Sequence, residues 1–242
     1  LKDGSTTFWS ETYRDYYHPK AGAYAQAQRL FLEKSCLKKR LEQGDVRVLE
    51  IGFGMGYNTL EALKVAQILR KHTLHVKAID HDRLLLQKSM EIVPESLHVQ
   101  LLEALFTCGK YEDDFTKVEF LNAEARYAMT RLDECFDVIF VDPFLESNNA
   151  SLVTLEFFQT LRKRLKLDGI LVASTALHVS QAGLTLAGFD VHVANDENSD
   201  IKGVVATLSK VSKSLHVKEP YRDPYGILSD KEIESERQKV LT

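Results

Sequence analysis

Segments rich in β-branched and apolar residues alternate along the chain with longer segments whose apolar residues recur at helical spacing. Strands that alternate with helices of this length predict an α/β domain, in which helices cover both faces of a mostly parallel sheet. The predicted strands are 46–52, 74–80, 118–122, 136–142, 169–175, 189–194 and 203–209, and the predicted helices are 21–41, 58–71, 82–92, 97–107, 124–133, 151–166 and 177–187.

The last two predicted strands are joined by residues 195–202 alone, which leave no room for a helix. So short a connection favours a hairpin, because parallel strands need a long crossover. The predicted sheet is therefore seven-stranded and mostly parallel, with one antiparallel strand. Glycine follows two of the predicted helices, at Gly169 and Gly188, as is typical of helix C-termini.

Three parts of the chain differ in composition. Residues 1–45 form an arm rich in aromatic and polar side chains, with a helix, that we expect to pack on or over the functional site. Residues 46–210 form the core with its alternating strands and helices. Residues 211–242 form a tail with a terminal helix, for which Ser229 and Glu232 have the spacing of a capping box.

The composition argues against several classes of protein. The 242 residues carry a net charge of −4 and a pI of about 6.1, without the basic excess typical of nucleic-acid-binding proteins. No apolar run approaches the ~18 residues that cross a bilayer, and the first residues lack the layout of a signal peptide. The three cysteines are too scattered for a zinc site. We therefore expect a cytoplasmic protein without a membrane or metal partner.

A turn with three glycines follows the first core strand, in the sequence VLEIGFGMGYN at 48–58. Open α/β sheets bind ligands at the carboxyl ends of their strands, and glycines there let the backbone approach a ligand closely. The glycines are Gly52, Gly54 and Gly56, whereas a dinucleotide fingerprint would place its last glycine where Tyr57 stands. The turn therefore argues against a nicotinamide dehydrogenase.

Acidic residues stand at the ends of the first three core strands: Glu50, Asp80 and Glu124. Such acids hold ribose hydroxyls in nucleotide-binding sheets, and they also cap the helix that follows, so both roles stay open for each residue. Glu50 would repel a pyrophosphate beside the glycine turn, but it would attract a sulfonium and an ammonium. The three acids and the turn favour S-adenosylmethionine, a positively charged nucleoside without phosphate.

This arrangement resembles the nucleotide-binding pattern of the class I methyltransferases over residues 46–209. The resemblance implies a Rossmann-like fold and S-adenosyl-L-methionine as the cofactor. The cofactor-binding residues that it implies are Glu50, Gly52, Phe53, Gly54, Gly56, Asn58, Asp80, Ala123 and Glu124.

Further motifs narrow the resemblance. The arm DGSTTFWSETYRDYYHPKAGAYAQAQRLFL, the strand end VDPF at 141–144 and the EPYRDP tail resemble the methyltransferase module of the bifunctional tRNA 5-methylaminomethyl-2-thiouridine biosynthesis protein, including its stand-alone bacterial form. The family implies transfer of a methyl group to the 5-aminomethyl group of the wobble uridine of tRNA, with or without the 2-thio group. The chain leaves no room for the flavin domain of the bifunctional members, so we expect methyl transfer alone.

Two departures from the family pattern bear on the site. After the fourth strand the chain reads DPFLESNNA, which lacks the serine, second proline and lysine that the family usually has. A lysine contact to tRNA is therefore in doubt here. Ala123 and Glu124 stand where the family usually has glycine and aspartate, which keeps the charge but lengthens the side chain.

The methyl acceptor is an amine that must be neutral to react, although free alkylamines are mostly protonated at pH 7. Asp142, at the end of the fourth strand, is the candidate catalytic residue: it would accept a hydrogen bond from the amine and take up its proton. Its alternative role is to cap the loop before Pro143. Phe144, Tyr17 and His18 are the candidate substrate-binding residues, with packing as the alternative for the aromatics and structural hydrogen bonding for His18.

Two other functions stay open from the sequence. An aminopropyltransferase of the spermidine synthase type shares the fold and a strand-four aspartate, although Glu50 and the DGS arm favour the methyltransferase. A non-catalytic module that binds a nucleoside or tRNA would keep the same turn. Binding of S-adenosylmethionine without methylation of aminomethyl tRNA would support that module.

Overall fold

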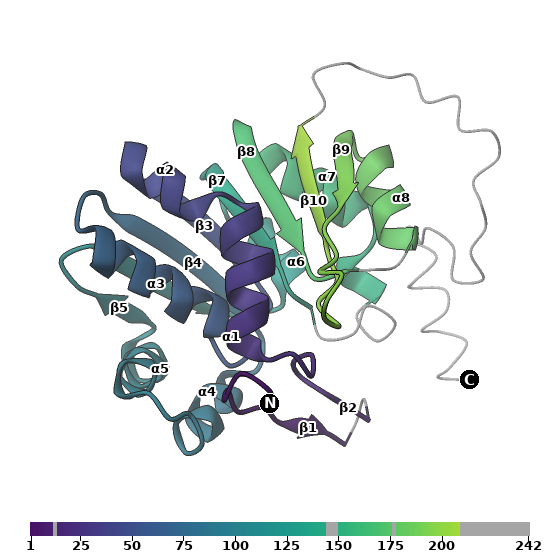
Figure 1. The fold of residues 1–242 in the computed structure, drawn as a ribbon. Helices are drawn as coiled ribbons and strands as arrows, with labels where there is room; N and C mark the ends of the chain where they lie inside the picture. Colours follow the sequence, from purple (N-terminus) through teal and green to yellow (C-terminus); the bar gives the residue numbers. More distant parts are fainter. Residues whose placement is uncertain (12–13, 144–149, 176–177, 209–242) are drawn as a thin grey trace.

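The computed structural model describes residues 1–11, 14–143, 150–175 and 178–208 (Figure 1). Their centre is an eight-stranded sheet with the order β5-β6-β4-β3-β7-β8-β10-β9, and a separate two-stranded ribbon pairs β1 with β2. The strands are β1 Trp9–Ser10, β2 Asp15–Tyr16, β3 Val46–Ile51, β4 Leu74–Asp80, β5 Lys110–Glu112, β6 Thr116–Asn122, β7 Phe136–Val141, β8 Leu165–Ala173, β9 Phe189–Val193 and β10 Val204–Leu208.

The predicted α/β fold is confirmed. Strands β6, β4, β3, β7 and β8 pair in parallel, and β10 pairs antiparallel with β8 and with β9, as the short connection between the last two strands predicted. The sheet has one strand more than predicted, because β5 pairs antiparallel with β6 at the edge. This strand of three residues, Lys-Tyr-Glu, is too short to carry a periodic apolar pattern.

Helices cover both faces of the sheet (Figure 1). The apolar residues of β3 alternate between them: Val46 and Val48 join the core under the N-terminal helices and α3, whereas Leu49 and Ile51 join the core under α6 and α7. The helical segments are α1 Ala23–Gln26, the π-helix η1 Ala27–Leu32, α2 Leu37–Gln43, α3 Tyr57–Leu69, α4 Arg83–Met90, α5 Ser96–Cys108, α6 Ala125–Met129, the 3-10 helix η3 Ala150–Leu152, α7 Leu155–Arg164 and α8 His178–Leu186.

Two local predictions were wrong. The helix expected over 21–41 is interrupted at Cys36, whose backbone is left-handed with a φ of 55°. Gly169 does not end a helix, because α7 ends at Arg164 and β8 already begins at Leu165. The register between β7 and β8 shifts there, and a Cβ on Gly169 would lie 2.9 Å from the carbonyl oxygen of Lys166. The glycine therefore accommodates an irregularity inside a strand.

The parallel strands end at one edge of the sheet, at the bottom of Figure 1, and the N-terminal arm with β1 and β2 lies at the same edge. The arm is held by Asp3, whose carboxylate accepts hydrogen bonds from Ser5 and from the backbone N–H of Ala25. The domain boundaries at 45 and 210 stay a prediction. The predicted tail helix with Ser229 and Glu232 lies outside the described residues.

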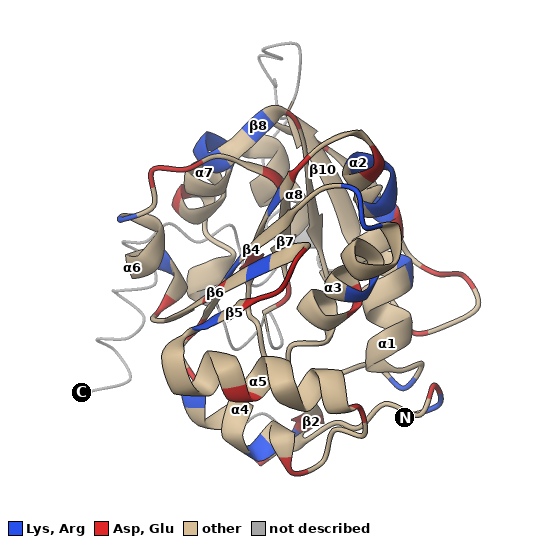
Figure 2. Cartoon of the chain, turned by 90° about the vertical axis from the view of Figure 1, so that its left-hand side faces the viewer, with Lys and Arg blue, Asp and Glu red and all other residues tan. Residues whose placement is uncertain are grey.

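Charged residues of both signs are mixed over the side that carries α4, α5 and β5 (Figure 2). In the described ranges, no helix is both long and apolar enough to cross a bilayer. No cluster of acidic, histidine and cysteine side chains suited to a metal ion occurs in that part of the chain.

Candidate functional site

Each of the three glycines in the turn has a left-handed backbone, but they differ in what surrounds them. Gly52 has a φ of 83°, and a Cβ there would lie 2.4 Å from the carbonyl oxygen of Asp142. Gly56 has a φ of 81°, and a Cβ there would lie 2.6 Å from the ring of Phe53. Gly54 has a φ of 56° with open space around it. Gly52 and Gly56 therefore allow close packing, and Gly54 leaves room for a ligand.

Glu50 is a fully buried carboxylic acid beside this turn. Its Oε2 accepts a hydrogen bond from the hydroxyl of Thr59, and its buried Oε1 has no hydrogen-bond partner in the described part of the chain. Burial raises the pKa of Glu50 to about 8; the hydrogen bond from Thr59 opposes this, and the nearby carboxylates of Asp142 and Asp80 add to it. A cationic ligand would stabilise the ionised form and satisfy the unpartnered oxygen.

Asp80 lies at the end of β4 in contact with the turn. Its Oδ2 accepts a hydrogen bond of 2.8 Å from the backbone N–H of Gly54, and its Oδ1 accepts one of 3.0 Å from that of Asp82. The Nδ1 of His81 lies 3.6 Å from the same Oδ1. The structure thus brings the predicted ribose-binding acid to the glycine that has open space around it.

Glu124 occupies the position expected for a helix cap. Its Oε2 accepts a hydrogen bond of 2.9 Å from the backbone N–H of Tyr127, at the start of α6. Ala123 donates its backbone N–H to the carbonyl oxygen of Asp80 at 3.0 Å, which joins the ends of β4 and β6. Glu124 therefore has the capping role that the sequence left open, and cofactor contacts by Glu124 and Ala123 stay a prediction.

Asp142 directly follows β7 and is fixed by two side chains. Its Oδ2 accepts a hydrogen bond of 2.9 Å from the amide of Asn58, and its Oδ1 accepts one of 2.5 Å from the hydroxyl of Ser174. Burial raises the pKa of Asp142, and the two hydrogen bonds oppose that rise. A carboxylate has about four lone-pair sites, so two hydrogen bonds leave acceptor capacity for a ligand.

The two hydroxyl groups that hold these acids were not predicted from the sequence. Thr59 stands in the first turn of α3, and Ser174 follows β8 at the same edge of the sheet as Asp142. The only sequence signal for Ser174 is a hydroxyl residue at the end of a predicted strand. Such positions recur throughout proteins, so the role becomes visible only once β7 and β8 are paired.

Tyr57, the first residue of α3, anchors the N-terminal arm. Its hydroxyl accepts a hydrogen bond of 3.1 Å from the backbone N–H of Thr6 and donates one of 3.0 Å to the carbonyl oxygen of Thr6. Its ring packs edge-to-face against His18, Tyr24 and His98, with centroid distances of 4.8–5.1 Å. Tyr57 and Asn58 are neighbours in the chain, so the first turn of α3 holds both the arm and Asp142.

Of the three candidate substrate-binding residues, the structure describes His18 and Tyr17, which have different contacts. His18 packs on Tyr57, its Nδ1 lies 3.0 Å from the hydroxyl of Thr7, and burial lowers its pKa to about 4. His18 is therefore neutral at pH 7, and its contacts fit the structural role that the sequence left open. Tyr17 is half-buried and donates its backbone N–H to the carbonyl oxygen of Phe8. Phe144 lies outside the described residues.

Comparisons with known proteins find relatives of this chain in sequence and in fold. A family model described as S-adenosyl-L-methionine-dependent methyltransferase matches residues 90–208. The crystal structure of MnmC2 from Aquifex aeolicus superposes with a TM-score of 0.76 at 27% identity, covering 96% of this chain and 72% of that chain.

Curated relatives also match in sequence. An uncharacterized protein of Methanocaldococcus jannaschii is 25% identical over 195 residues, which cover 78% of this chain and 52% of that protein. The tRNA 5-methylaminomethyl-2-thiouridine biosynthesis bifunctional protein MnmC of Cupriavidus metallidurans is 26% identical over 204 residues, which cover 78% of this chain and 30% of that protein. The chain thus spans about half or less of the length of these relatives.

These findings confirm the predicted resemblance, the methyltransferase fold and the cofactor. The matched family is described as S-adenosyl-L-methionine-dependent. The turn has an open glycine, a carboxylate beside it and a buried acid with an oxygen that has no partner in the described part of the chain. Contacts between these residues and the cofactor stay a prediction. The fold agrees with that of the MnmC2 structure over nearly the whole chain.

Proposed function

From this similarity in sequence and fold to the methyltransferase module of the bifunctional tRNA-modifying protein, we propose that the chain methylates the 5-aminomethyl group of a wobble uridine in tRNA. The methyl donor is S-adenosyl-L-methionine, and the product is 5-methylaminomethyl uridine or its 2-thio form. In this proposal the tRNA substrate is inferred from the relatives, and the chemistry of methyl transfer is inferred from the site.

The observation that carries the proposal is the contact between Gly52 and Asp142. The proposed cofactor turn and the proposed acceptor residue meet so closely that a Cβ on Gly52 would lie 2.4 Å from the carbonyl oxygen of Asp142. Methyl transfer needs donor and acceptor side by side, since it is a direct displacement that depends on positioning. A turn and a carboxylate in this contact suit that requirement.

Asp142 would act on the amine. The hydrogen bonds from Asn58 and Ser174 fix the orientation of its carboxylate and leave lone pairs free to accept a hydrogen bond from the acceptor nitrogen. Because burial raises the pKa of Asp142, it holds a proton more readily than an exposed aspartate does. Asp142 would therefore orient the amine and take up the proton that the amine releases.

The acids beside the turn would also favour the donor. S-adenosyl-L-methionine, when bound, supplies an electrophilic methyl group on a sulfonium. Glu50 and Asp80 would lower the free energy of a cationic ligand in the turn, since opposite charges attract strongly where water is excluded. Tyr17 and Phe144 would contact the uridine ring beside Asp142, as bases that undergo chemistry must leave the stack.

The proposal is tested with labelled S-adenosyl-L-methionine and tRNA from a strain blocked at the aminomethyl stage. Nucleoside analysis should find 5-methylaminomethyl uridine. Asp142→Asn should keep cofactor affinity and lose most of the turnover, because the amide accepts the proton poorly. The matched control is Asp133→Asn, a fully exposed aspartate before the other end of β7.

The outcomes separate the alternatives. Turnover that survives in Asp142→Asn would refute the role of Asp142. Cofactor binding without any methyl transfer would support a non-catalytic module instead, and aminopropyl transfer from decarboxylated S-adenosylmethionine would support the synthase alternative.

A further inference from the structure

The ribbon of β1 and β2 carries two exposed aromatic side chains in contact. Trp9 and Tyr16 stand directly opposite each other in the antiparallel pair, with ring centroids 5.0 Å apart and ring planes at 71°. The two residues are 45% and 51% exposed. In this edge-to-face arrangement only one ring face is used by the pair, so aromatic faces remain available to a ligand.

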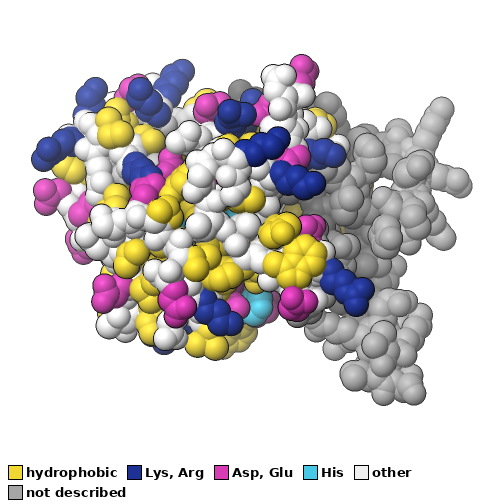
Figure 3. Space-filling model, turned by 60° about the horizontal axis from the view of Figure 1, so that its bottom comes forward, with side chains coloured by type: hydrophobic (Ala, Val, Ile, Leu, Met, Phe, Trp, Pro, Cys, Tyr) yellow, Lys and Arg dark blue, Asp and Glu magenta, His cyan; other side chains and the backbone are white. Residues whose placement is uncertain are grey.

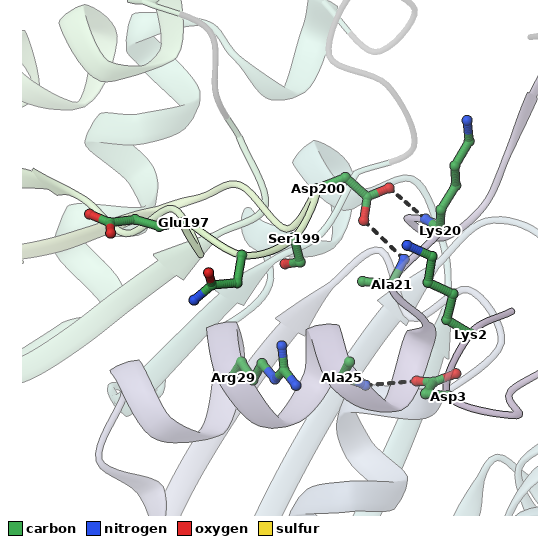
Figure 4. Close-up of a pocket in the computed structure, with 10 residues that line it drawn as sticks. Lys2, Asp3, Lys20, Ala21, Ala25, Arg29, Glu197, Ser199 and Asp200 are labelled. Carbon is green, nitrogen blue, oxygen red and sulfur yellow. Dashed lines mark hydrogen bonds between the residues drawn. The ribbon is translucent and has the colours of Figure 1, made fainter.

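Both ends of the ribbon are tied down. Before β1, Thr6 is held by Tyr57. After β2, the carboxylate of Asp200 accepts hydrogen bonds of 2.7 and 2.9 Å from the backbone N–H groups of Lys20 and Ala21 (Figure 4). Two-residue strands are not stable on their own, so these contacts pre-organise the ribbon. Its aromatic pair is presented in a fixed position.

The ribbon lies at the same edge of the sheet as the proposed acceptor site, to which a series of contacts connects it. Trp9 is two residues from Thr7, and Tyr16 is two residues from His18; two residues span at most about 7 Å of backbone. Thr7 and His18 contact each other, and His18 packs on Tyr57, the neighbour of Asn58 that binds Asp142. The face at this edge shows gathered hydrophobic side chains among charged ones (Figure 3).

We propose that Trp9 and Tyr16 form a stacking platform for an unpaired base of the tRNA loop, next to the base that is methylated. This inference rests on the proposed function. A uridine in the acceptor site belongs to a single-stranded loop, whose adjacent bases are unstacked and commonly bind to aromatic side chains. An exposed aromatic pair beside the site is the surface that such a base needs.

Charge contributes less than stacking at this surface. The ribbon and its flanks carry Arg14 and Lys20, but also Glu11 and Asp15. Figure 4 shows the side chain of Lys20 extending away from the acids of the nearby cleft, where it can meet a phosphate. Because the basic and acidic residues here are equal in number, we expect RNA binding to depend only weakly on salt.

The test uses the fact that Trp9 is the one tryptophan of the 242 residues. An RNA hairpin whose loop carries the unmodified anticodon sequence is titrated into the protein, and tryptophan fluorescence is recorded. Stacking on the loop should quench it with saturation, whereas a fully paired RNA duplex should not. No methyl transfer is involved, so the result is independent of the proposed reaction.

Variants of Trp9 and Tyr16 measure how much each aromatic residue contributes to RNA affinity. Tyr16→Ala should weaken binding of the fluorescently labelled hairpin about tenfold, and so should Trp9→Ala, while Trp9→Phe should restore most of the affinity. Leu167→Ala is the matched control, since Leu167 is 91% exposed at the start of β8, away from the site edge. Affinity for S-adenosyl-L-methionine should stay unchanged in all four variants.

The possible failures are distinct. Quenching by the RNA loop without methylation of aminomethyl tRNA would support the stacking platform and refute the proposed function. Methylation with an unchanged tRNA KM in Trp9→Ala and Tyr16→Ala would refute the platform. Fluorescence that changes with protein concentration alone, and not with RNA, would assign the aromatic pair to contact between copies of the chain and would also refute the platform.

Discussion

The acids at the two ends of the neighbouring strands β3 and β7 have different kinds of partner. At the amino ends, Asp137 is paired with Lys166 at 2.9 Å and Glu134 with Arg47 at 3.1 Å. At the carboxyl ends, Glu50 and Asp142 are held by hydroxyl and amide groups, which carry no charge. Burial raises the pKa of both of these acids.

This difference separates acids with a structural role from those to which we assign a functional one. A carboxylate with a lysine or arginine partner is already neutralised, so it offers little to a ligand. A buried carboxylate held by neutral donors keeps its orientation and its attraction for a cation, at a cost in stability. The carboxyl end of the two strands therefore suits a positively charged ligand.

The largest effect is expected for Gly52→Ala. The added Cβ would lie 2.4 Å from the carbonyl oxygen of Asp142, in a backbone with a φ of 83°, so the turn must move away from Asp142. We expect a loss of roughly 3 kcal/mol or more in the free energy of unfolding, measured in urea, together with loss of turnover.

Gly54→Ala is the matched variant in the same turn. Its φ of 56° costs an alanine only about 1 kcal/mol, and the Cβ enters open space. The variant should fold, yet bind S-adenosyl-L-methionine less tightly, as the methyl group projects into the proposed cofactor space. Equal stability losses in the two variants would contradict the packing role of Gly52.

The next effect is expected for Glu50→Gln, in the pH dependence of the free energy of unfolding. Burial raises the pKa of Glu50 from 4.5 to about 8 on folding. Between these values the folded protein keeps a proton that the unfolded chain has lost, so stability falls as the pH rises from about 4.5 to about 8. Glutamine does not ionise, and the variant should be more stable than the parent above about pH 8, on the order of a few kcal/mol.

Urea unfolding across this pH range measures the difference. The control is Glu134→Gln at the other end of the strands, which removes the partner of Arg47 and should lower stability instead. If Glu50→Gln were no more stable than the parent at high pH, then burial of the ionised Glu50 would not lower the stability of the protein. The same variant should bind S-adenosyl-L-methionine less tightly, since it lacks the charge.

The parallel core and the glycine turn could be predicted from the sequence because they rest on local patterns. A run of β-branched and apolar residues defines β3, and a left-handed turn requires glycine at Gly52. The partners of the acids could not be predicted. Ser174 is 32 residues from Asp142 and Tyr57 is 51 residues from Thr6, so only the packed sheet shows that they meet.

A smaller effect is expected for Ser174→Ala. The hydrogen bond from Ser174 lowers the pKa of Asp142, so its removal should raise that pKa and move the acidic limb of the kcat–pH profile to higher pH. We expect kcat to fall about tenfold with the KM for the cofactor unchanged, because Asp142 loses one of its two orienting bonds.

The control for Ser174→Ala is another buried serine. Ser89→Ala in α4 removes a buried hydroxyl that has no hydrogen-bond partner in the described ranges, so it should leave kcat and its pH profile unchanged. A fall in kcat without a shift of the pH profile would indicate that Ser174 only supports the structure.

The smallest effect is expected at the amino ends, for Lys166→Ala. Lys166 is 39% exposed, and Asp137 keeps a hydrogen bond of 2.8 Å from the backbone N–H of Arg47 after the lysine is removed. The loss should be about 1 kcal/mol, or a fall of ~2–4 °C in Tm, with kcat and its pH profile unchanged. A loss of turnover as large as that of Ser174→Ala would show that charge at the amino ends reaches the site, and the contrast between the two ends would then fail. An unchanged pH profile would mean that the pKa of Asp142 is independent of charge at the amino ends and follows from its burial and its neutral partners.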